Sequence, residues 1–354
     1  MNPVDRCDLR ARVEKALSVF LAQQRALLTQ IDPALDRVAE AIEAFVLGGG
    51  KRLRPAFAYW GFRGAGGNDS DEVVAAVSAL ELVQASALIH DDVMDASDTR
   101  RGEPAVHRRF ANLHAAHGWD GAAESFGAAS AILLGDLCLT WSDELLRVSG
   151  LDPAALLRAR PVFDLMRTEV IAGQYLDVHA QATADSSLRR ASTVARYKSA
   201  KYTVERPLLL GAAIADAPAP VEAAYSRYGL ALGEAFQLRD DVLGVFGDPA
   251  TTGKPAGDDL REGKRTYLVA AALEGARNAA ATRLRRSLGD PDLTEREVAG
   301  VREIIVDSGA LRRTEERIAS LTEAALDALA PLDLAADAAT VLTELARAAT
   351  HRIA

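Results

Sequence analysis

Two pairs of adjacent aspartates are the residues of this sequence best suited to chemistry. Asp91 and Asp92 are followed by Asp95 in the run LIHDDVMD, and Asp240 and Asp241 close the run FQLRDD about 150 residues later. On a helix, Asp91 and Asp95 lie one turn apart on one face, where like charges are costly without a cation between them. Mg²⁺ typically binds one or two carboxylates together with phosphate oxygens and water. The two motifs therefore predict magnesium sites that hold a phosphorylated substrate.

A structural explanation of these motifs has to be weighed as well. One such motif in an acidic protein is more often a solvated, negatively charged helix end. Two motifs that each close an apolar helix can face each other across a cavity and hold several cations around one diphosphate. This second possibility gains weight from the cations nearby.

Lysines and arginines gather near both aspartate motifs. The run GGGKRLRP places flexible backbone beside three cations, which suits phosphate capture, although its spacing is not that of a P-loop. Each of these cations alone is more often a surface charge, and it is their clustering beside the aspartates that favours binding. His90 is expected to pack or to form a local hydrogen bond, outside the site. The cations considered are Lys51, Arg52, Arg54, Arg100, Arg101, Lys198, Lys201, Lys254 and Lys264.

Length and composition narrow the class of protein. The chain has 354 residues, 49% of them hydrophobic, which predicts one large domain over residues 1–354. Its net charge of −9 argues against an unspecific nucleic-acid binder. Two cysteines are too few for a disulfide framework. No apolar leader and no uninterrupted apolar stretch of membrane-spanning length is found, so we expect a soluble, cytoplasmic protein without a transmembrane segment.

The elements that must position the aspartates are helices. Leucine and alanine dominate, aromatic residues make up only 5%, and alternating β-branched runs are scarce. The pattern predicts an all-α bundle. The predicted helices are Leu9–Gln30, Pro33–Leu47, Asp71–His90, Gly127–Val148, Ala154–Ala180, Ala191–Ala215, Pro220–Val245, Lys264–Glu274, Glu295–Ser308 and Ala310–Ile353.

These motifs, in this order, resemble the trans-prenyl diphosphate synthases (polyprenyl synthetases), above all bacterial geranylgeranyl diphosphate synthases. The resemblance runs from about Gly48 to Lys264 and rests on GGGKRLRP, LIHDDVMD with TRRG, KSAKY, FQLRDD and GDPATTGKPAGDDLREGK. It implies an isoprenoid-synthase helical bundle around a deep central cavity, usually a homodimer. It also implies Mg²⁺, about three ions in each active site, and isopentenyl and allylic diphosphates as substrates.

The resemblance assigns roles to individual residues. Asp91, Asp95 and Asp240 would bind the metal ions directly. Asp92 and Asp241 would support these ligands, and Asp241 is also assigned to the metal site. Arg100, Lys198 and Lys254 would hold the allylic diphosphate and act in catalysis with the aspartates. The remaining substrate-binding residues would be Lys51, Arg54, Gln84, Arg101, Ser199, Gln237 and Lys264, with Asp177 reaching the metals through water. One departure is Gly244, which stands where the second motif normally has its last aspartate.

The helix before Asp91 also suggests the length of the product. Ser86 and Ala87, one turn back, are small, whereas relatives that stop at the C15 farnesyl product often have a bulky aromatic residue there. Val83 lies further down, and Trp141 on the next helix is a candidate floor. We therefore predict the C20 product, geranylgeranyl diphosphate; alternatively, Ser86 and Ala87 only allow close helix packing.

Several alternatives remain open from the sequence. The product could be farnesyl diphosphate or a chain of C25 and above. A class I terpene cyclase would share the fold, but it needs no second diphosphate pocket. A silent synthase subunit usually loses aspartates or cations that this chain retains. Head-to-tail transfer of a prenyl group is the predicted activity.

Overall fold

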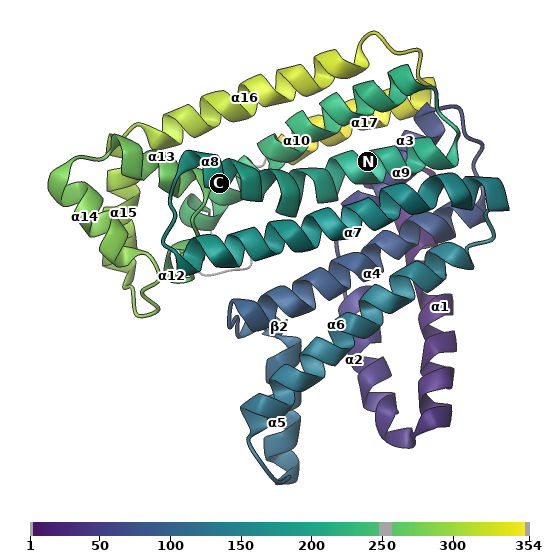
Figure 1. Ribbon diagram of the computed structural model, residues 1–354, viewed down its shortest axis with the longest axis horizontal. Helices are drawn as coiled ribbons and strands as arrows, with labels where there is room; N and C mark the ends of the chain where they lie inside the picture. The colour runs from purple at the N-terminus through teal and green to yellow at the C-terminus, as the bar shows by residue number, and fades with distance from the viewer. Residues whose placement is uncertain (1–2, 248–256, 351–354) are drawn as a thin grey trace. The chain divides into compact units, whose positions relative to one another are not determined.

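The computed structural model describes residues 3–247 and 257–350. In these ranges the chain is almost entirely helical, which confirms the all-α prediction (Figure 1). Three of the described helices are not α-helices: η1 and η2 are short 3₁₀ helices, and η3 is a π-helix. The elements are η1 (Pro3–Asp8), α1 (Leu9–Ile31), η2 (Pro33–Leu35), α2 (Asp36–Leu47), α3 (Leu53–Gly64), α4 (Asp71–Met94), β1 (Thr99–Arg100), β2 (Glu103–Pro104), α5 (Val106–His117), α6 (Ala123–Arg147), α7 (Pro153–Ala182), α8 (Leu188–Val194), η3 (Ala195–Glu205), α9 (Arg206–Ile214), α10 (Ala219–Phe246), α12 (Asp258–Arg261), α13 (Tyr267–Gly275), α14 (Asn278–Ser287), α15 (Glu295–Asp307), α16 (Ala310–Leu329) and α17 (Ala336–Thr350).

The chain divides into two compact units. Among the described residues, the first comprises 3–160 and 210–216, and the second comprises 161–209, 217–247 and 257–350. Each unit contains one of the two aspartate motifs. The single domain expected from the sequence stays a prediction.

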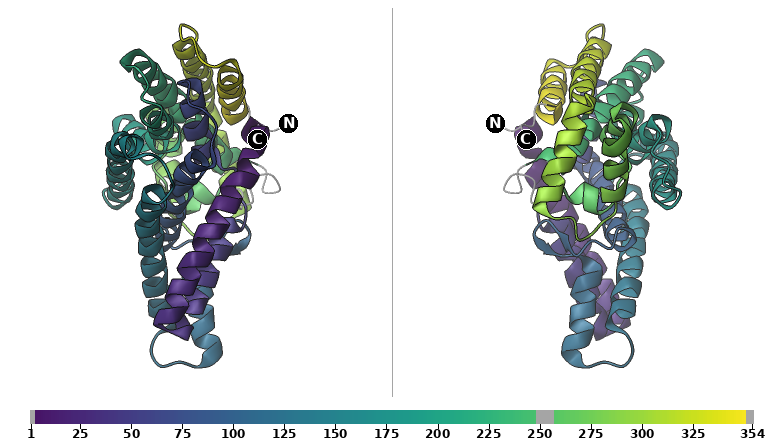
Figure 2. Two further views of the ribbon diagram at one scale, coloured as in Figure 1. Left: turned by 90° about the vertical axis from the view of Figure 1, so that its right-hand side faces the viewer. Right: turned by 90° about the vertical axis from the view of Figure 1, so that its left-hand side faces the viewer.

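Helix α4 forms the centre of the first unit. Ser70 caps its first turn by accepting a hydrogen bond from the backbone N–H of Val73, and two acidic residues follow, which the helix dipole favours. Its side chains are buried on most sides, where α6, α1 and α3 pack against it. Helices α5 and α6 lie side by side and antiparallel (Figure 2). The first aspartate motif thus stands at the end of a core helix.

Helix α10 has the corresponding place in the second unit, where α16 and η3 pack against it. A Cβ atom on Gly229 would lie 2.5 Å from the Cα of Glu205, and one on Gly233 would lie 2.5 Å from the Cα of Ala200. Gly173 of α7 approaches the backbone of Lys198 just as closely. Glycines on two helices therefore let the π-helix pack tightly between α7 and α10.

The structure corrects some predicted boundaries. The predicted helix Ala310–Ile353 is two helices, α16 and α17, because Pro331 interrupts the helical backbone between them. Helix α3 is absent from the predicted helices, because its glycines Gly61 and Gly64 have low helix propensity. Burial of its aromatic side chains, among them Tyr59 and Trp60, outweighs the low helix propensity of those glycines.

Two described helices are long and apolar enough to cross a membrane by length and composition alone. The most apolar stretch of α4 is 72% buried inside the protein, and that of α6 is 28% buried. Helix α4 is therefore a core helix. Helix α6 has an outer apolar face that includes Ile132 and Leu133, and the absence of a membrane span stays a prediction.

Candidate active site

The first aspartate motif lies at the carboxyl end of α4. Helix α4 runs past Asp91 to Met94, and Asp95 is its C-cap. The end of a helix dipole repels negative charge there, so these aspartates need a cation close by. The Asp91 side chain is 15% exposed, so it is accessible to one.

Arg100 is the cation that α4 itself anchors. Its Nε donates a hydrogen bond of 2.9 Å to Oδ1 of Asp92, and its Nη2 bonds the same oxygen and lies 3.7 Å from Oδ2 of Asp91. Burial raises the pKa of Asp92, and the hydrogen bond from Arg100 opposes that rise. Asp92 is buried and faces Arg100, so it positions this guanidinium group beside Asp91.

Arg101, the next residue, contacts the glycine-rich loop instead. Its Nη1 donates a hydrogen bond of 2.7 Å to the carbonyl of Gly49, and its guanidinium lies 5.8 Å from the ring centre of Phe45. Arg100 is the last residue of β1 and pairs with Glu103 of β2, and Arg101 begins the turn of this hairpin. This hairpin therefore connects the aspartate motif, within one unit, to the glycine-rich loop that carries Lys51 and precedes Arg54 of α3.

The predicted chain-length residues lie on α4 and α6 as expected. Val83 and Ser86 are buried and Ala87 is half-buried on α4, and Trp141 is buried on α6. Gln84, predicted to bind substrate, is half-buried on α4. Nε2 of His90 donates a hydrogen bond of 3.0 Å to the carbonyl of Ile132 on α6, which agrees with the expected packing or hydrogen-bonding role of this histidine.

The second aspartate motif lies in the last two turns of α10. Asp241 is fully enclosed, and its Oδ1 accepts a hydrogen bond of 2.7 Å from the amide of Gln237. Burial raises the pKa of Asp241 to about 8, and the nearby carboxylates of Asp259 and Asp240 add to the rise. A divalent cation at this position would offset the repulsion among these carboxylates.

Gly244 lies directly against Asp259. A Cβ atom on Gly244 would overlap the Asp259 carboxylate, which projects from α12 toward α10. The place left open by the missing third aspartate is therefore filled by another carboxylate. Lys264 binds Glu262 and lies 3.8 Å from Asp259, so this predicted substrate ligand is paired with acids in α12 and at its C-cap.

The π-helix carries the remaining predicted ligands of the second unit. Nζ of Lys198 donates a hydrogen bond of 2.7 Å to Oδ2 of Asp177 on α7, and Ser199 follows on the same helix. Lys201 is instead held by Glu169 and Glu205 at 2.9 and 3.1 Å. Lys254 lies outside the described residues.

The donor set suits Mg²⁺ when substrate completes the coordination. Over residues 3–247 and 257–350, no three His, Cys, Asp or Glu side chains are grouped closely enough to hold a metal ion by themselves. Mg²⁺ prefers octahedral oxygen coordination and usually keeps water and substrate phosphates as ligands. Asp91 and Asp95, and separately Asp240, offer the one or two carboxylates that this mode requires.

The sequence reasoning missed the acids that hold the cations in place. Glu81 binds Arg52 in the first unit, and Glu169 and Glu205 bind Lys201 in the second. Glu81 is a charged residue within an otherwise apolar helical run, and this pattern could have indicated a buried partner for a cation.

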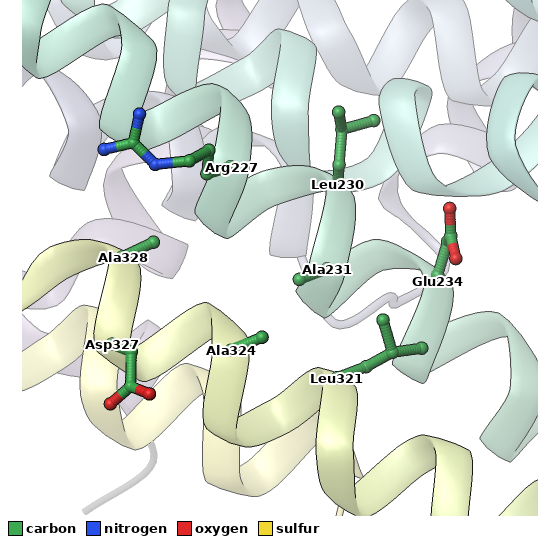
Figure 3. Close-up of a pocket in the computed structure, with 8 residues that line it drawn as sticks. All are labelled: Arg227, Leu230, Ala231, Glu234, Leu321, Ala324, Asp327 and Ala328. Atoms are coloured by element: carbon green, nitrogen blue, oxygen red, sulfur yellow. The ribbon is translucent and has the colours of Figure 1, made fainter.

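An open groove of about 580 Å³ lies elsewhere in the second unit, between α10 and α16 (Figure 3). Leucine and alanine side chains line its floor, and Arg227, Glu234 and Asp327 stand at its edges. No predicted site residue lines this groove.

Comparisons with known proteins identify the relatives of this chain. The family model for polyprenyl synthetase matches residues 36–308. A crystal structure of geranylgeranyl pyrophosphate synthase from Corynebacterium glutamicum, complexed with isoprenyl diphosphate and magnesium, is 43% identical with a TM-score of 0.94, covering 98% of this chain and 99% of that one. The geranylgeranyl diphosphate synthase of Mycobacterium tuberculosis is 35% identical over 81% of this chain and 78% of its own length. The geranylfarnesyl diphosphate synthase of Aeropyrum pernix is 32% identical over 83% and 87%.

Proposed function

Because the chain belongs to the polyprenyl synthetase family of prenyltransferases, we propose that it condenses isopentenyl diphosphate with allylic diphosphates, head to tail, and makes geranylgeranyl diphosphate. The allylic substrates are dimethylallyl, geranyl and farnesyl diphosphate. Each condensation releases one diphosphate.

The observation that carries this proposal is the turn of Arg100 and Arg101. Arg100 binds Asp92 of the first aspartate motif, and Arg101 binds Gly49 in the loop that carries Lys51 and leads to Arg54 in the first turn of α3. Cations at the metal-binding motif can hold one diphosphate, and the cations at the neighbouring loop can hold a second. A terpene cyclase, which binds one diphosphate, has no need of it.

The residues of this chain have separate tasks in the reaction. Asp91, Asp95 and Asp240 hold the cations, and Asp92 and Asp241 support these ligands. Arg100 and Lys198 hold the allylic diphosphate with Lys254, and their positive charge stabilises that group as its bond to the allylic carbon breaks. Lys51, Arg54 and Arg101 orient isopentenyl diphosphate, whose double bond attacks the allylic cation, and Gln84 is assigned to the same substrate. Ser199 and Gln237 line the place where the cation forms, and Lys264 belongs to the same pocket.

Magnesium, about three ions for each site, supplies Lewis-acid stabilisation of the departing diphosphate when bound. The Corynebacterium relative forms a complex with isoprenyl diphosphate and magnesium, which supports magnesium as the ion; the number of three comes from the resemblance. The final proton goes to the released diphosphate.

The C20 product is supported by the relatives and by the small residues Ser86 and Ala87 on α4, which we call the chain-length wall. Two of the similar proteins are geranylgeranyl synthases, while the Aeropyrum relative is a geranylfarnesyl synthase. Ser86 and Ala87 are the small residues that would let a chain pass down α4 toward Trp141 on α6.

A second copy of the chain is the proposed partner. Ile132 and Leu133 on α6 are 47% and 62% exposed, and neighbouring Trp119 and Phe126 are also exposed. Covering such an apolar face is a common reason for homodimers to form. Size-exclusion chromatography with light scattering should give a dimer, and Leu133→Glu should give a monomer. A cytoplasmic location belongs to the same proposal.

The deciding experiment incubates the purified protein with isopentenyl diphosphate and each allylic primer, with Mg²⁺ or with EDTA. Mass spectrometry of the products should show C20 with Mg²⁺ and nothing with EDTA. A C15 product, or one of C25 and above, would retain the chemistry and refute the predicted length. No elongation from any primer would refute the proposed function and favour a cyclase or a silent subunit.

A further inference from the structure

Arg52 behaves unlike the cations on either side of it. Lys51 is exposed and Arg54 is half-buried, whereas Arg52 is only 3% exposed. Its backbone is in the left-handed region, with φ of 50°, at the N-cap of α3. A residue with a side chain rarely adopts this conformation unless its surroundings hold it there.

The contacts of the Arg52 side chain supply that restraint. Nη1 donates a hydrogen bond of 2.6 Å to Oε2 of Glu81 on α4, and Nη2 donates one of 2.8 Å to the carbonyl of Val46 in the last turn of α2. The side chains of Arg52 and Glu81 are 2% and 7% exposed, so water screens their attraction little. One guanidinium group thus joins the end of α2, the start of α3 and the middle of α4.

The charges around the glycine-rich loop also indicate that Arg52 and Glu81 act together. A Cβ atom on Gly50 would lie 3.5 Å from Nη1 of Arg52 and 3.6 Å from Nη2 of Arg101, so both guanidinium groups border this glycine. Burial and the charge of Arg52 lower the pKa of Arg101, and the carboxylate of Glu81 raises it. Glu81 therefore offsets the repulsion between two arginines beside the loop.

We propose that Arg52 and Glu81 are positioning residues for isopentenyl diphosphate, which fix residues 48–54 so that Lys51 and Arg54 hold one diphosphate. This inference rests on the proposed function. Arg52 itself is enclosed and bonded within the protein, and its effect on substrate is exerted through its neighbours. The allylic diphosphate, assigned to Arg100 and Lys198, is held by other residues.

The test uses Arg52→Lys, which keeps the charge and loses the forked geometry, and Glu81→Gln, which keeps the shape and loses the charge. Steady-state kinetics should show KM for isopentenyl diphosphate raised about tenfold or more, with kcat and KM for farnesyl diphosphate changed by less than about threefold, the size expected when a binding group loses its orientation. Calorimetric titration of the protein with isopentenyl diphosphate alone should show the same loss without turnover.

Arg158→Met is the matched control. Arg158 also binds backbone carbonyls at a helix end, those of Ala213 and Ile214 at 2.9 and 3.0 Å, and lies 3.5 Å from the carboxylate of Asp216. It should leave both KM values unchanged. Thermal unfolding of every variant identifies any that fails to fold. Because Arg52→Lys and Glu81→Gln are both conservative and alter different residues, failure of one to fold leaves the other as the test.

Two results would overturn the inference. In the first, both variants fold and bind isopentenyl diphosphate as the unaltered protein does. In the second, the KM values for both substrates rise together, which would indicate a general loss of structure. If the unaltered protein elongates no primer, the proposed function itself fails, and this outcome is distinguishable because it requires no variant.

Discussion

The carboxylate of Asp259 occupies the space beside Gly244 where the side chain of a longer residue would lie. Asp259 and Gly244 are 15 residues apart in the sequence and belong to α12 and α10. The second motif therefore lacks its third aspartate and keeps a carboxylate at that place. We therefore expect the site to tolerate the departure.

Substituting Gly244 should harm the protein, even when the new residue restores the usual motif. Gly244→Asp brings a second carboxylate against Asp259, and Gly244→Ala displaces it. Overpacking of this kind costs about 1–3 kcal/mol. We expect lower free energies of unfolding in urea and lower kcat for both variants.

Gly300→Ala is the control for this prediction, because a Cβ there meets only the end of the flexible Arg283 side chain. It should be neutral or stabilising, since alanine favours helix more than glycine does. If Gly244→Asp raised kcat without loss of stability, the assigned role of Asp259 would be wrong.

The aspartates of the first motif should separate into two classes. Asp91→Asn and Asp95→Asn should lower kcat by about a hundredfold or more at saturating Mg²⁺ and leave the melting temperature equal or higher, since each removes repulsion between like charges. Asp92→Asn should also lower the melting temperature, because it leaves Arg100 without its buried partner. Circular dichroism melts and initial rates distinguish the classes, and equal melting for all three variants would contradict this division.

The product should shorten when the chain-length wall is filled. Ala87→Phe places an aromatic ring one turn before Asp91, and we expect the main product to change from C20 to C15, measured by mass spectrometry. Ala87→Ser keeps the residue small and should leave C20 unchanged. If Ala87→Phe still makes the C20 product, the side chain at position 87 does not limit the length of the product.

Trp141 tests the floor of the same region. It is buried on α6, against which α4 packs. Trp141→Ala should extend the product beyond C20 and cost about 3–5 kcal/mol of stability through the cavity it leaves. Unchanged product length in a folded variant would remove Trp141 from the floor.

Acid should weaken the ion-pair network around the π-helix. Burial raises the pKa of Glu169, but hydrogen bonds from Arg206 and Lys201 outweigh it and hold the pKa below its ordinary value of 4.5. A carboxylate with a depressed pKa stabilises the fold fully above pH 4.5, and this contribution is lost as the pH falls through the folded-state value. Urea unfolding between pH 7 and pH 3.5 should therefore show a smaller loss of stability in Glu169→Gln than in the unaltered protein.

The exposed helix pair of Arg312 and Glu316 provides the control for this pH dependence. Glu316→Gln should change the pH dependence little, because exposed ion pairs contribute little to stability. Parallel curves for Glu169→Gln and the unaltered protein would exclude the network as the acid-sensitive element.

Much of the fold could be predicted because local signals and burial agree. Helix α4 begins at Asp71, after a capping serine, and its apolar run ends at the aspartates, which agrees with the predicted helix Asp71–His90. The π-helix within the predicted Ala191–Ala215 helix gave no such signal. Its backbone depends on close approach to Gly173, Gly229 and Gly233, which are distant in sequence.

The sequence by itself determined the chemistry available to this protein. Paired aspartates at the ends of apolar helices, with arginines and lysines nearby, already indicated metal ions and diphosphates. Only the tertiary structure decided which charges are held by partners: Arg52 is turned inward to Glu81, 29 residues away, while Lys51 stays exposed. It also put Asp259 in the place of a side chain that Gly244 lacks. The reason is physical, because burial and pairing depend on contacts between distant residues, which helical periodicity does not specify.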